Sequence, residues 1–322
     1  MYAPRGGSLK LAQNLRIYIL FLAVFLFAAL FLLLCGCHKQ KLGFLEEQQA
    51  PLSFLFFSDT QTAPESENYS ALEELFMLAV NVEQQPVLAV FGGDTVNKGG
   101  DTAEWQNFWL AAETPLAGLI TAAVAGNHDN HILLAEQFDY PRLAPLGQGE
   151  GFFYSFDLGP VHFIMLDSNI MGAANRKDVE WLQSDLNSVQ ARQAIWRIAV
   201  MHHPMWSVVE NPKDIARAET MREHFLPLLE AGSVDLLLVG HQHVFTRSLP
   251  MRGDVASDDG NGIIQIMTAS GMKESYILGS WEFIAVSATA PNYLLLIADS
   301  DELTVTAYDE QGKAFDICVF TR

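Results

Sequence analysis

The sequence predicts an α/β fold, a four-layer α/β/β/α sandwich in which two packed mixed sheets carry helices on their outer faces. Two observations lead to this prediction. From residue 51 onward, short apolar runs alternate with helix-like segments, which is typical of parallel strands joined by helices. A second series of apolar runs has fewer helical segments between its members, and it indicates a further sheet.

The first series of runs is rich in β-branched and aromatic residues, as expected of buried strands. Its members are residues 52–57, 87–91, 121–125, 195–201 and 234–239. The second series is expected to form strands at residues 152–157, 161–166, 263–268, 292–298 and 303–308. Gly159 and Pro160 lie between the first two strands of this second series and predict a tight hairpin.

Helical periodicity appears between the strands of the first series. We expect helices at residues 71–82, 101–113, 179–189 and 221–230. Asp101 is followed three residues later by Glu104, which is a capping-box pattern for the second helix. Loops around a substrate pocket are expected at residues 130–150, 205–216 and 271–290. Residues 51–322 contain no linker-like stretch and are expected to form one domain.

The N-terminal segment, residues 1–37, has the features of a signal peptide or membrane anchor. Residues 17–34 are an unbroken, largely apolar run of 18 residues preceded by basic residues. As a helix, this run would span about 27 Å, close to the thickness of a bilayer core. Leu34-Cys35-Gly36-Cys37 resembles a bacterial lipobox with Cys37 as the lipidated residue, although Cys35 is unusual at its position.

Three interpretations of this segment stay open: a cleaved lipoprotein signal, an uncleaved anchor and a buried core helix. The first two predict an exported protein, tethered to the membrane on its periplasmic or extracellular side. Residues 38–50 are polar and are expected to serve as the tether.

The charge of the chain restricts its partners. The formal net charge is −19, and such a surface repels nucleic-acid backbones, so a nucleic-acid polymer is not expected as a partner. A small phosphorylated substrate is compatible with this charge, because bound metal ions can invert it locally.

Polar residues follow directly after each strand of the first series. Ligands of α/β sheets bind at the carboxyl ends of strands, so these side chains are expected to meet at one edge. Carboxylate, amide oxygen and imidazole together form a ligand set that suits Mn, Fe or Zn. The candidates are Asp59, Asp94, Asn127, His128, His202, His241 and His243.

These residues lie in five blocks that occur in order along the chain. The blocks read Asp59-Thr60-Gln61, Gly93-Asp94-Thr95-Val96-Asn97, Gly126-Asn127-His128-Asp129, His202-His203-Pro204 and Gly240-His241-Gln242-His243. The pattern resembles that of the calcineurin-like metallophosphoesterase superfamily, which includes purple acid phosphatases and bacterial phosphodiesterases. The resemblance covers about residues 52–270 and implies metal-dependent hydrolysis of phosphate mono- or diesters.

The resemblance also implies two metal ions, a bridging hydroxide as nucleophile and a phosphorylated small molecule or lipid headgroup as substrate. His128 would not bind metal but would stabilise or protonate the leaving oxygen. The implied ligands are Asp59 and His243 for the first ion, Asp94 as a bridge between both, and Asn127, His202 and His241 for the second.

Two positions depart from the commonest family pattern. Gln61 stands where many members have a metal-binding His, and an amide oxygen is a weaker ligand for a transition metal. Asn97 stands where some members have an Asp that orients the catalytic His, and it can accept a hydrogen bond but carries no charge. The alternative to an enzyme is therefore a non-catalytic lipoprotein that retains the fold and binds a metal or another ligand.

Several other polar residues have structural interpretations. His162 is expected to be a buried core histidine with its hydrogen bonds satisfied, and His203 is expected to point away from the site. Trp105 and Trp109 are expected to pack against neighbouring helices. Arg247 could contact phosphate or form a structural ion pair, and the sequence favours neither.

Overall fold

The computed structural model of the protein describes residues 51–62, 66, 68–139, 153–171 and 176–322. The expected membrane signal at 1–37 and the tether at 38–50 lie outside these residues. None of the helices in the described part of the chain is long and apolar enough to cross a bilayer. Residues 50–322 group into one compact unit.

The first sheet has six strands in the order β15-β14-β13-β1-β2-β3. Its parallel half, β1 to β3, carries three of the five candidate blocks at its carboxyl ends, and its other half is antiparallel. The strands are β1 (Leu52–Phe57), β2 (Leu88–Phe91), β3 (Ile120–Ala123), β13 (Asn292–Ala298), β14 (Glu302–Asp309) and β15 (Ala314–Thr321).

The second sheet has seven strands in the order β12-β8-β11-β7-β6-β5-β4. Its centre, β11-β7-β6-β5, is parallel, and antiparallel strands flank it on both sides. The strands are β4 (Tyr154–Leu158), β5 (Val161–Met165), β6 (Trp196–Val200), β7 (Leu236–Val239), β8 (Val244–Ser248), β11 (Ile264–Met267) and β12 (Ile284–Thr289). A separate two-stranded ribbon joins β9 (Met251–Arg252) and β10 (Val255–Ala256).

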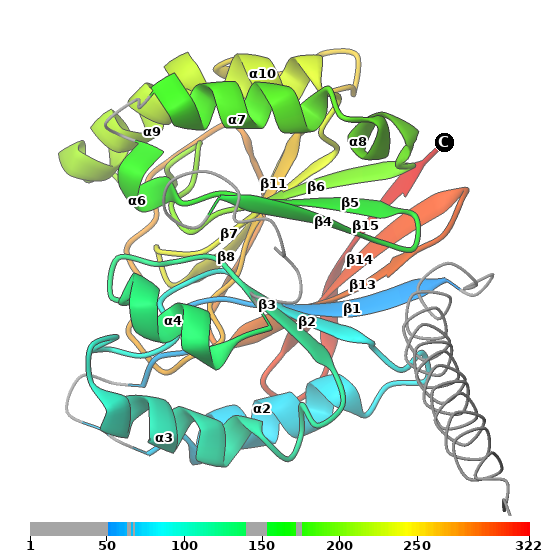
Figure 1. The fold of residues 1–322 in the computed structure, drawn as a ribbon. Coiled ribbons are helices and arrows are strands. Elements are labelled where there is room, and N and C mark those ends of the chain that lie inside the picture. The colour runs from blue at the N-terminus through cyan, green and yellow to red at the C-terminus, as the bar shows by residue number, and fades with distance from the viewer. Residues whose placement is uncertain (1–50, 63–65, 67, 140–152, 172–175) are drawn as a thin grey trace, which may run out of the picture. The chain divides into compact units, whose positions relative to one another are not determined.

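Helices lie on both outer sides of the paired sheets (Figure 1). Those beside the first sheet are α2 (Ser70–Val80), α3 (Thr102–Ala112) and α4 (His131–Gln137). Those beside the second are α6 (Ser168–Met171), α7 (Arg176–Leu186), α8 (Val189–Gln193), α9 (Pro212–His224) and α10 (Leu226–Ala231). The predicted four-layer α/β/β/α sandwich with two mixed sheets is confirmed.

The alternation of side chains along the strands explains the layers. In β1, the Phe54 ring packs edge-on against Phe163 of the second sheet, with 5.1 Å between centroids. Phe57 lies three residues later and meets Phe76 of α2 at 4.7 Å. Successive residues of a strand face opposite sides, so a strand that is apolar throughout can bury both faces. The continuous apolar run of β1 therefore requires a layer on each side.

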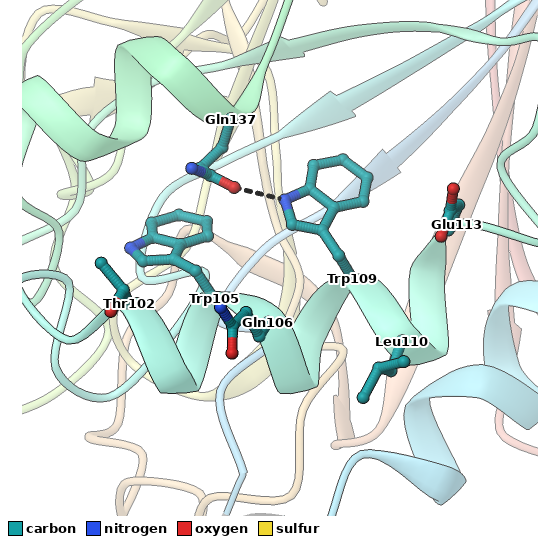
Figure 2. A pocket seen from close by; sticks show the side chains of 7 residues that line it. All are labelled: Thr102, Trp105, Gln106, Trp109, Leu110, Glu113 and Gln137. Atoms are coloured by element: carbon teal, nitrogen blue, oxygen red, sulfur yellow. Dashed lines mark hydrogen bonds between the residues drawn. The ribbon is translucent and has the colours of Figure 1, made fainter.

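Helices α3 and α4 are joined by a side-chain hydrogen bond (Figure 2). Trp109 Nε1 donates to Gln137 Oε1 at 2.8 Å, and Trp105 Nε1 donates to the Gly99 carbonyl at 2.9 Å. Both indoles pack against Phe108, at 6.1 Å for Trp105 and 5.1 Å for Trp109. The expected packing role of these two tryptophans is confirmed.

The helix expected at residues 221–230 is two helices. α9 ends at His224, and α10 begins at Leu226 with Pro227 in its first turn. A proline interrupts a continuous helix because it lacks an N–H group, but it is tolerated in a first turn. α9 also begins inside the expected loop 205–216, where Asn211 caps it by accepting from Lys213 N at 2.9 Å.

Two other expected loops contain regular structure. α4 lies within 130–150, where Asn130 caps it, and β12 lies within 271–290. The expected strand series also do not correspond to the two sheets. Each sheet draws strands from both series and adds strands that the sequence did not reveal, among them β8, β12 and β15.

Candidate metal centre

The five candidate blocks meet where the carboxyl ends of the parallel strands of both sheets come together. The loops after β1 and β2 are tied by Asp59 N, which donates to the Gly93 carbonyl at 3.0 Å. Across the sheets, His241 N donates to Asp59 Oδ2 at 2.8 Å. Within the second sheet, Gly240 N donates to the His202 carbonyl at 3.0 Å. The backbone itself therefore fixes the relative positions of the candidate ligands.

Four candidate ligands have a left-handed backbone. The φ angles are 50° for Asp59, 51° for Asp94, 77° for His241 and 49° for His243. Positive φ is uncommon outside glycine, and such residues gather at functional sites where the surrounding structure compensates for the strain. These residues lie in the loops that directly follow β1, β2 and β7.

Glycines next to these residues permit the close approach of the loops. A Cβ added at Gly240 would lie 2.2 Å from Asp59 Oδ2, and one added at Gly126 would lie 2.2 Å from Asp94 N. Only a residue without a side chain fits at either position.

Two groups of possible metal ligands share His202. One contains Asp59, Asp94 and His202, and the other contains His202, His203 and His241. Within each group the ligand atoms lie within 4.8 Å of one another, and nearly all of these side chains are buried. The geometry therefore offers one position where carboxylate oxygens and an imidazole converge, and an adjacent one where three imidazoles converge.

The remaining sequence candidates lie beside these groups. Asn127 Oδ1 is 3.3 Å from His202 Nε2, and His243 Nε2 is 3.4 Å from Asp59 Oδ1. Gln61 Nε2 donates to Asp94 Oδ2 at 3.2 Å. The structure thus brings together all seven residues predicted as ligands, including Gln61.

Three imidazoles are oriented as metal ligands usually are. His202 Nδ1 donates to the Gly92 carbonyl at 2.9 Å, and His243 Nδ1 donates to the Glu274 carbonyl at 3.0 Å. His241 Nε2 donates to Asp214 Oδ1 at 3.2 Å. A ligating histidine commonly donates its other N–H to a carbonyl or carboxylate, which fixes the ring and leaves one nitrogen for the metal. For His202 and His243 that nitrogen is Nε2.

The electrostatics of the centre favour a cation. Although burial raises the pKa of Asp94, the neighbouring His202 outweighs it and holds the pKa well below its ordinary value. Burial likewise lowers the pKa of His202, but Asp94 outweighs it and raises that pKa to about 9. A metal ligand must be neutral imidazole, so metal binding at His202 releases a proton.

Two buried oxygen atoms support the same conclusion. Asp59 Oδ1 and Gln61 Oε1 have no hydrogen-bond partner within the described part of the chain. A buried polar atom without a partner costs about 1–3 kcal/mol, so such atoms call for an explanation. A bound cation would satisfy both, and the donor set fits a transition metal.

His128 lies at the rim of the centre and is partly exposed. Its Nε2 is 4.0 Å from Asp94 Oδ2, and its Nδ1 donates to the Asn97 carbonyl at 2.7 Å. The Asn97 side chain instead donates to the Thr62 carbonyl at 3.1 Å. The backbone carbonyl of Asn97 therefore orients His128, whereas the sequence pattern had suggested the Asn97 side chain for this role.

Asp129 also belongs to the site, although it is not among the residues predicted from the sequence. Its Oδ2 accepts from Asp94 N at 2.8 Å and from Gly126 N at 2.9 Å. Burial and the Asp94 carboxylate raise the pKa of Asp129 to about 7. Asp129 thus joins the loops after β2 and β3, and its place directly after Gly126-Asn127-His128 was the available signal.

Two further residues were missed because they lie in expected loops. Asp214, in the first turn of α9, accepts from His241, and Lys273 Nζ lies 3.4 Å from His128 Nε2. Both are far in sequence from the blocks they contact, so no local pattern could place them.

The expectation that His203 points away from the site is wrong. Its ring centroid is 4.3 Å from that of His241, although its Nδ1 contacts Ser168 Oγ at 2.8 Å and its Nε2 contacts Arg217. Burial lowers the pKa of His203, and the nearby His202 lowers it further. His203 is therefore part of the histidine cluster.

Two other sequence interpretations are settled by contacts elsewhere. His162 is buried between Asp157, at 2.8 Å, and Asp185, at 3.1 Å, which confirms a satisfied core histidine. Arg247 pairs with Asp316 at 2.7 and 3.0 Å, so of the two roles left open it has the structural one.

Comparison with known proteins agrees with this site. The model of the calcineurin-like phosphoesterase family matches residues 52–245, more than half of the chain. The chain therefore belongs to that family.

The chain is also similar to plant purple acid phosphatases. It is 28% identical to purple acid phosphatase 21 of Arabidopsis thaliana over 171 residues, which are 50% of this chain and 39% of that protein. It is 26% identical over 188 residues to a probable inactive purple acid phosphatase 9 of the same plant, covering 53% of this chain and 28% of that protein. The chain thus spans well under half the length of these relatives.

Solved structures show the same fold. A purple acid phosphatase from yellow lupin (Lupinus luteus) seeds superposes with a TM-score of 0.69 at 18% identity, over 85% of this chain and 54% of that one. GAP50, the anchor in the inner membrane complex of Plasmodium, superposes with a TM-score of 0.59 at 16% identity, over 85% and 89%. At these identities the likeness concerns the fold alone.

Proposed function

We propose that the protein hydrolyses phosphate mono- or diesters at a centre of two metal ions. One observation carries the proposal: His202 and His243 each donate Nδ1–H to a backbone carbonyl and turn Nε2 toward the carboxylates of Asp94 and Asp59. This arrangement serves metal binding, whereas in a serine or cysteine hydrolase Nε2 faces the hydroxyl or thiol of the nucleophile. Family membership supports it, because calcineurin-like proteins are named as phosphoesterases.

The proposed ligands are those that the family resemblance implies. Asp94, whose Oδ2 lies 3.2 Å from Gln61 Nε2 and 3.4 Å from His202 Nε2, would bridge the ions, which would be Mn, Fe or Zn. When bound, two such ions supply charge that stabilises the phosphoryl oxygens, and they lower the pKa of water to give a nucleophile. The first ion would be held by Asp59, His243 and the weaker ligand Gln61, and the second by Asn127, His202 and His241.

The chain's own residues would then complete the reaction. His128 is fixed through Nδ1 by the Asn97 carbonyl, so its Nε2, which lies 3.4 Å from Lys273 Nζ, is the nitrogen that would meet the leaving oxygen and donate a proton to it. Asp129 holds the loops that carry Asp94 and His128 in register by accepting three backbone N–H groups. Positioning of this kind dominates phosphoryl transfer.

The test is a screen of the purified chain on phosphate monoesters and diesters with Mn, Fe, Zn, Ca and Mg added in turn. We expect chelation to abolish turnover and re-addition of one of the transition metals to restore it. Absence of turnover on every ester with every metal would contradict the proposal. It would favour the alternative, a non-catalytic binding protein, which Gln61 and the similarity to a probable inactive phosphatase support.

We further propose that the protein is exported and tethered to the membrane by residues 1–37, with 38–50 as the tether. The support is the apolar run 17–34 and the lipobox-like end at Cys37. Mass spectrometry of the native N-terminus should find a lipidated Cys37, whereas an intact Met1 would indicate an uncleaved anchor. Recovery of the chain in the cytosol would contradict both.

A further inference from the structure

Residues 270–276 form a segment that crosses the metal centre and is held from both sheets. Gly271 N donates to the Asp59 carbonyl at 2.9 Å, and Met272 N donates to the Gln61 carbonyl at 3.2 Å. On the other side, the Glu274 carbonyl accepts from His243 Nδ1 at 3.0 Å. Lys273 lies between these anchors, so its position relative to the candidate ligands is fixed.

The Lys273 ammonium faces the catalytic rim of the site. Its Nζ lies 3.4 Å from His128 Nε2, and its side chain is partly buried. Burial lowers the pKa of Lys273, while the negative charges of Asp94 and Asp59 act in the opposite direction. Because these two nitrogen atoms lie so close together, Lys273 Nζ and His128 Nε2 can both donate to the same anionic group.

A purely structural role does not account for this lysine. Within the described residues, Lys273 forms no ion pair, and Glu104, the acid outside the centre whose charge acts on it, already contacts Lys98 at 4.0 Å. Asp59 and Asp94 are the proposed metal ligands, and two cations would neutralise them. The charge of Lys273 then remains uncompensated beside His128, and a partly buried cation of this kind favours an anion.

We infer that Lys273 binds a non-bridging oxygen of the phosphoryl group beside His128 and thereby makes the centre favour phosphate monoesters over diesters. The inference rests on the proposed function. A monoester carries close to two negative charges near neutral pH, because its second pKa is about 6, whereas a diester carries one. An added ammonium in a partly dehydrated site therefore contributes more to binding the monoester.

The test compares 4-nitrophenyl phosphate with methyl 4-nitrophenyl phosphate. The two share a leaving group, and the second differs by one methyl group on a phosphate oxygen. Lys273→Met removes the charge and keeps most of the side-chain length. We expect it to lower kcat/KM for the monoester about 10–100-fold, as for a lost charged hydrogen bond, and for the diester less than about 5-fold. The inhibition constant of inorganic phosphate should rise by a factor similar to the loss of kcat/KM for the monoester.

Two variants serve as controls. Lys273→Arg keeps the positive charge and should retain most of the preference for the monoester. Lys313→Met removes an exposed lysine from the turn between β14 and β15 and should change neither substrate. An equal loss on both esters in Lys273→Met, or no loss on either, would overturn the inference.

Failure of the inference can be told apart from failure of the proposed function. If the wild type turns over neither ester, the proposed function fails, and binding of inorganic phosphate to the Mn-loaded chain is measured by calorimetry instead. Weaker phosphate binding by Lys273→Met, about 10-fold or more, would still support the role of Lys273 as an anion ligand. Unchanged phosphate binding would overturn it.

Discussion

Asp94 and His128 lie side by side in the site but should have separable roles. Asp94 contacts His202, Gln61 and the His128 backbone. The His128 ring lies at the rim of the site, where its Nδ1 donates to the Asn97 carbonyl. We expect Asp94→Ala to lose metal, because it removes the carboxylate proposed to bridge the ions. His128→Ala should keep metal and lose turnover about 10²–10⁴-fold, as for an acid–base group.

Elemental analysis and turnover of the two variants check this prediction together. His224→Ala, on a partly exposed histidine at the end of α9, is the matched control and should change neither quantity. Loss of metal from His128→Ala would show that the roles have been assigned wrongly.

Gln61 should make the first ion the weaker of the two. Its side chain is fully buried beside Asp94, and its Oε1 has no hydrogen-bond partner within the described residues. Gln61→His supplies an imidazole, a stronger ligand, and should raise retention of the first ion during a chelator titration. Gln61→Asn has the same amide on a shorter side chain and should lower it.

Elemental analysis across the titration measures how much metal wild type and each variant retain at each chelator concentration. If wild type already retains two ions and Gln61→His changes neither retention nor turnover, Gln61 is not a weak ligand.

At the scale of the elements, the strands of the site were the most predictable part of the molecule. Runs such as 52–57 are apolar throughout, and β1 occupies that range without change. The strand-end residues Asp59 and Asp94 were identified because ligands gather at the carboxyl ends of parallel strands. Their left-handed φ angles were not predictable, because hydrogen bonds from distant loops impose them.

The elements that the sequence missed depend on tertiary contacts. β12 alternates between partly buried and exposed residues and exists as a strand because it pairs with β8. α9 has a weak apolar stripe, with only Ala218 and Met221 buried, so its periodicity was hidden. The same helix brings Asp214 to His241, which explains why that contact could not be found from the sequence.

His162 links the β4–β5 hairpin to α7 and should make stability depend on pH. Although burial lowers its pKa, hydrogen bonds to Asp157 and Asp185 outweigh this effect and raise the pKa to about 9, from an ordinary value of 6.5. The folded state therefore binds this proton more tightly than the unfolded state. Its contribution is fully present below about pH 6.5 and is lost as pH rises through about 9.

Denaturation of the wild type and His162→Gln in chelator measures this contribution while metal binding is absent. We expect the stability difference between wild type and variant to be about 3 kcal/mol larger at pH 6 than at pH 9.5. A constant difference across this range would contradict the assigned charge of His162.

At the scale of the whole molecule, the site exists only because the two sheets are held together. Arg247 of β8 and Asp316 of β15 form a bidentate ion pair between the sheets, and both side chains are largely buried. We expect a double-mutant cycle with Arg247→Met and Asp316→Asn to give a coupling energy of about 1–3 kcal/mol in unfolding. Strict additivity of the two changes would show that the pair does not stabilise the sheet contact.

The central claim is that two metal ions bind at the meeting point of the two sheets and share Asp94. Anomalous X-ray scattering from crystals of the Mn-loaded chain tests it most directly, because it locates each ion independently of activity. We predict two peaks about 3.5–4 Å apart, both within ligand distance of Asp94, with one beside Asp59 and His243 and the other beside His202. A single peak, or peaks that lie away from Asp94, would contradict the claim.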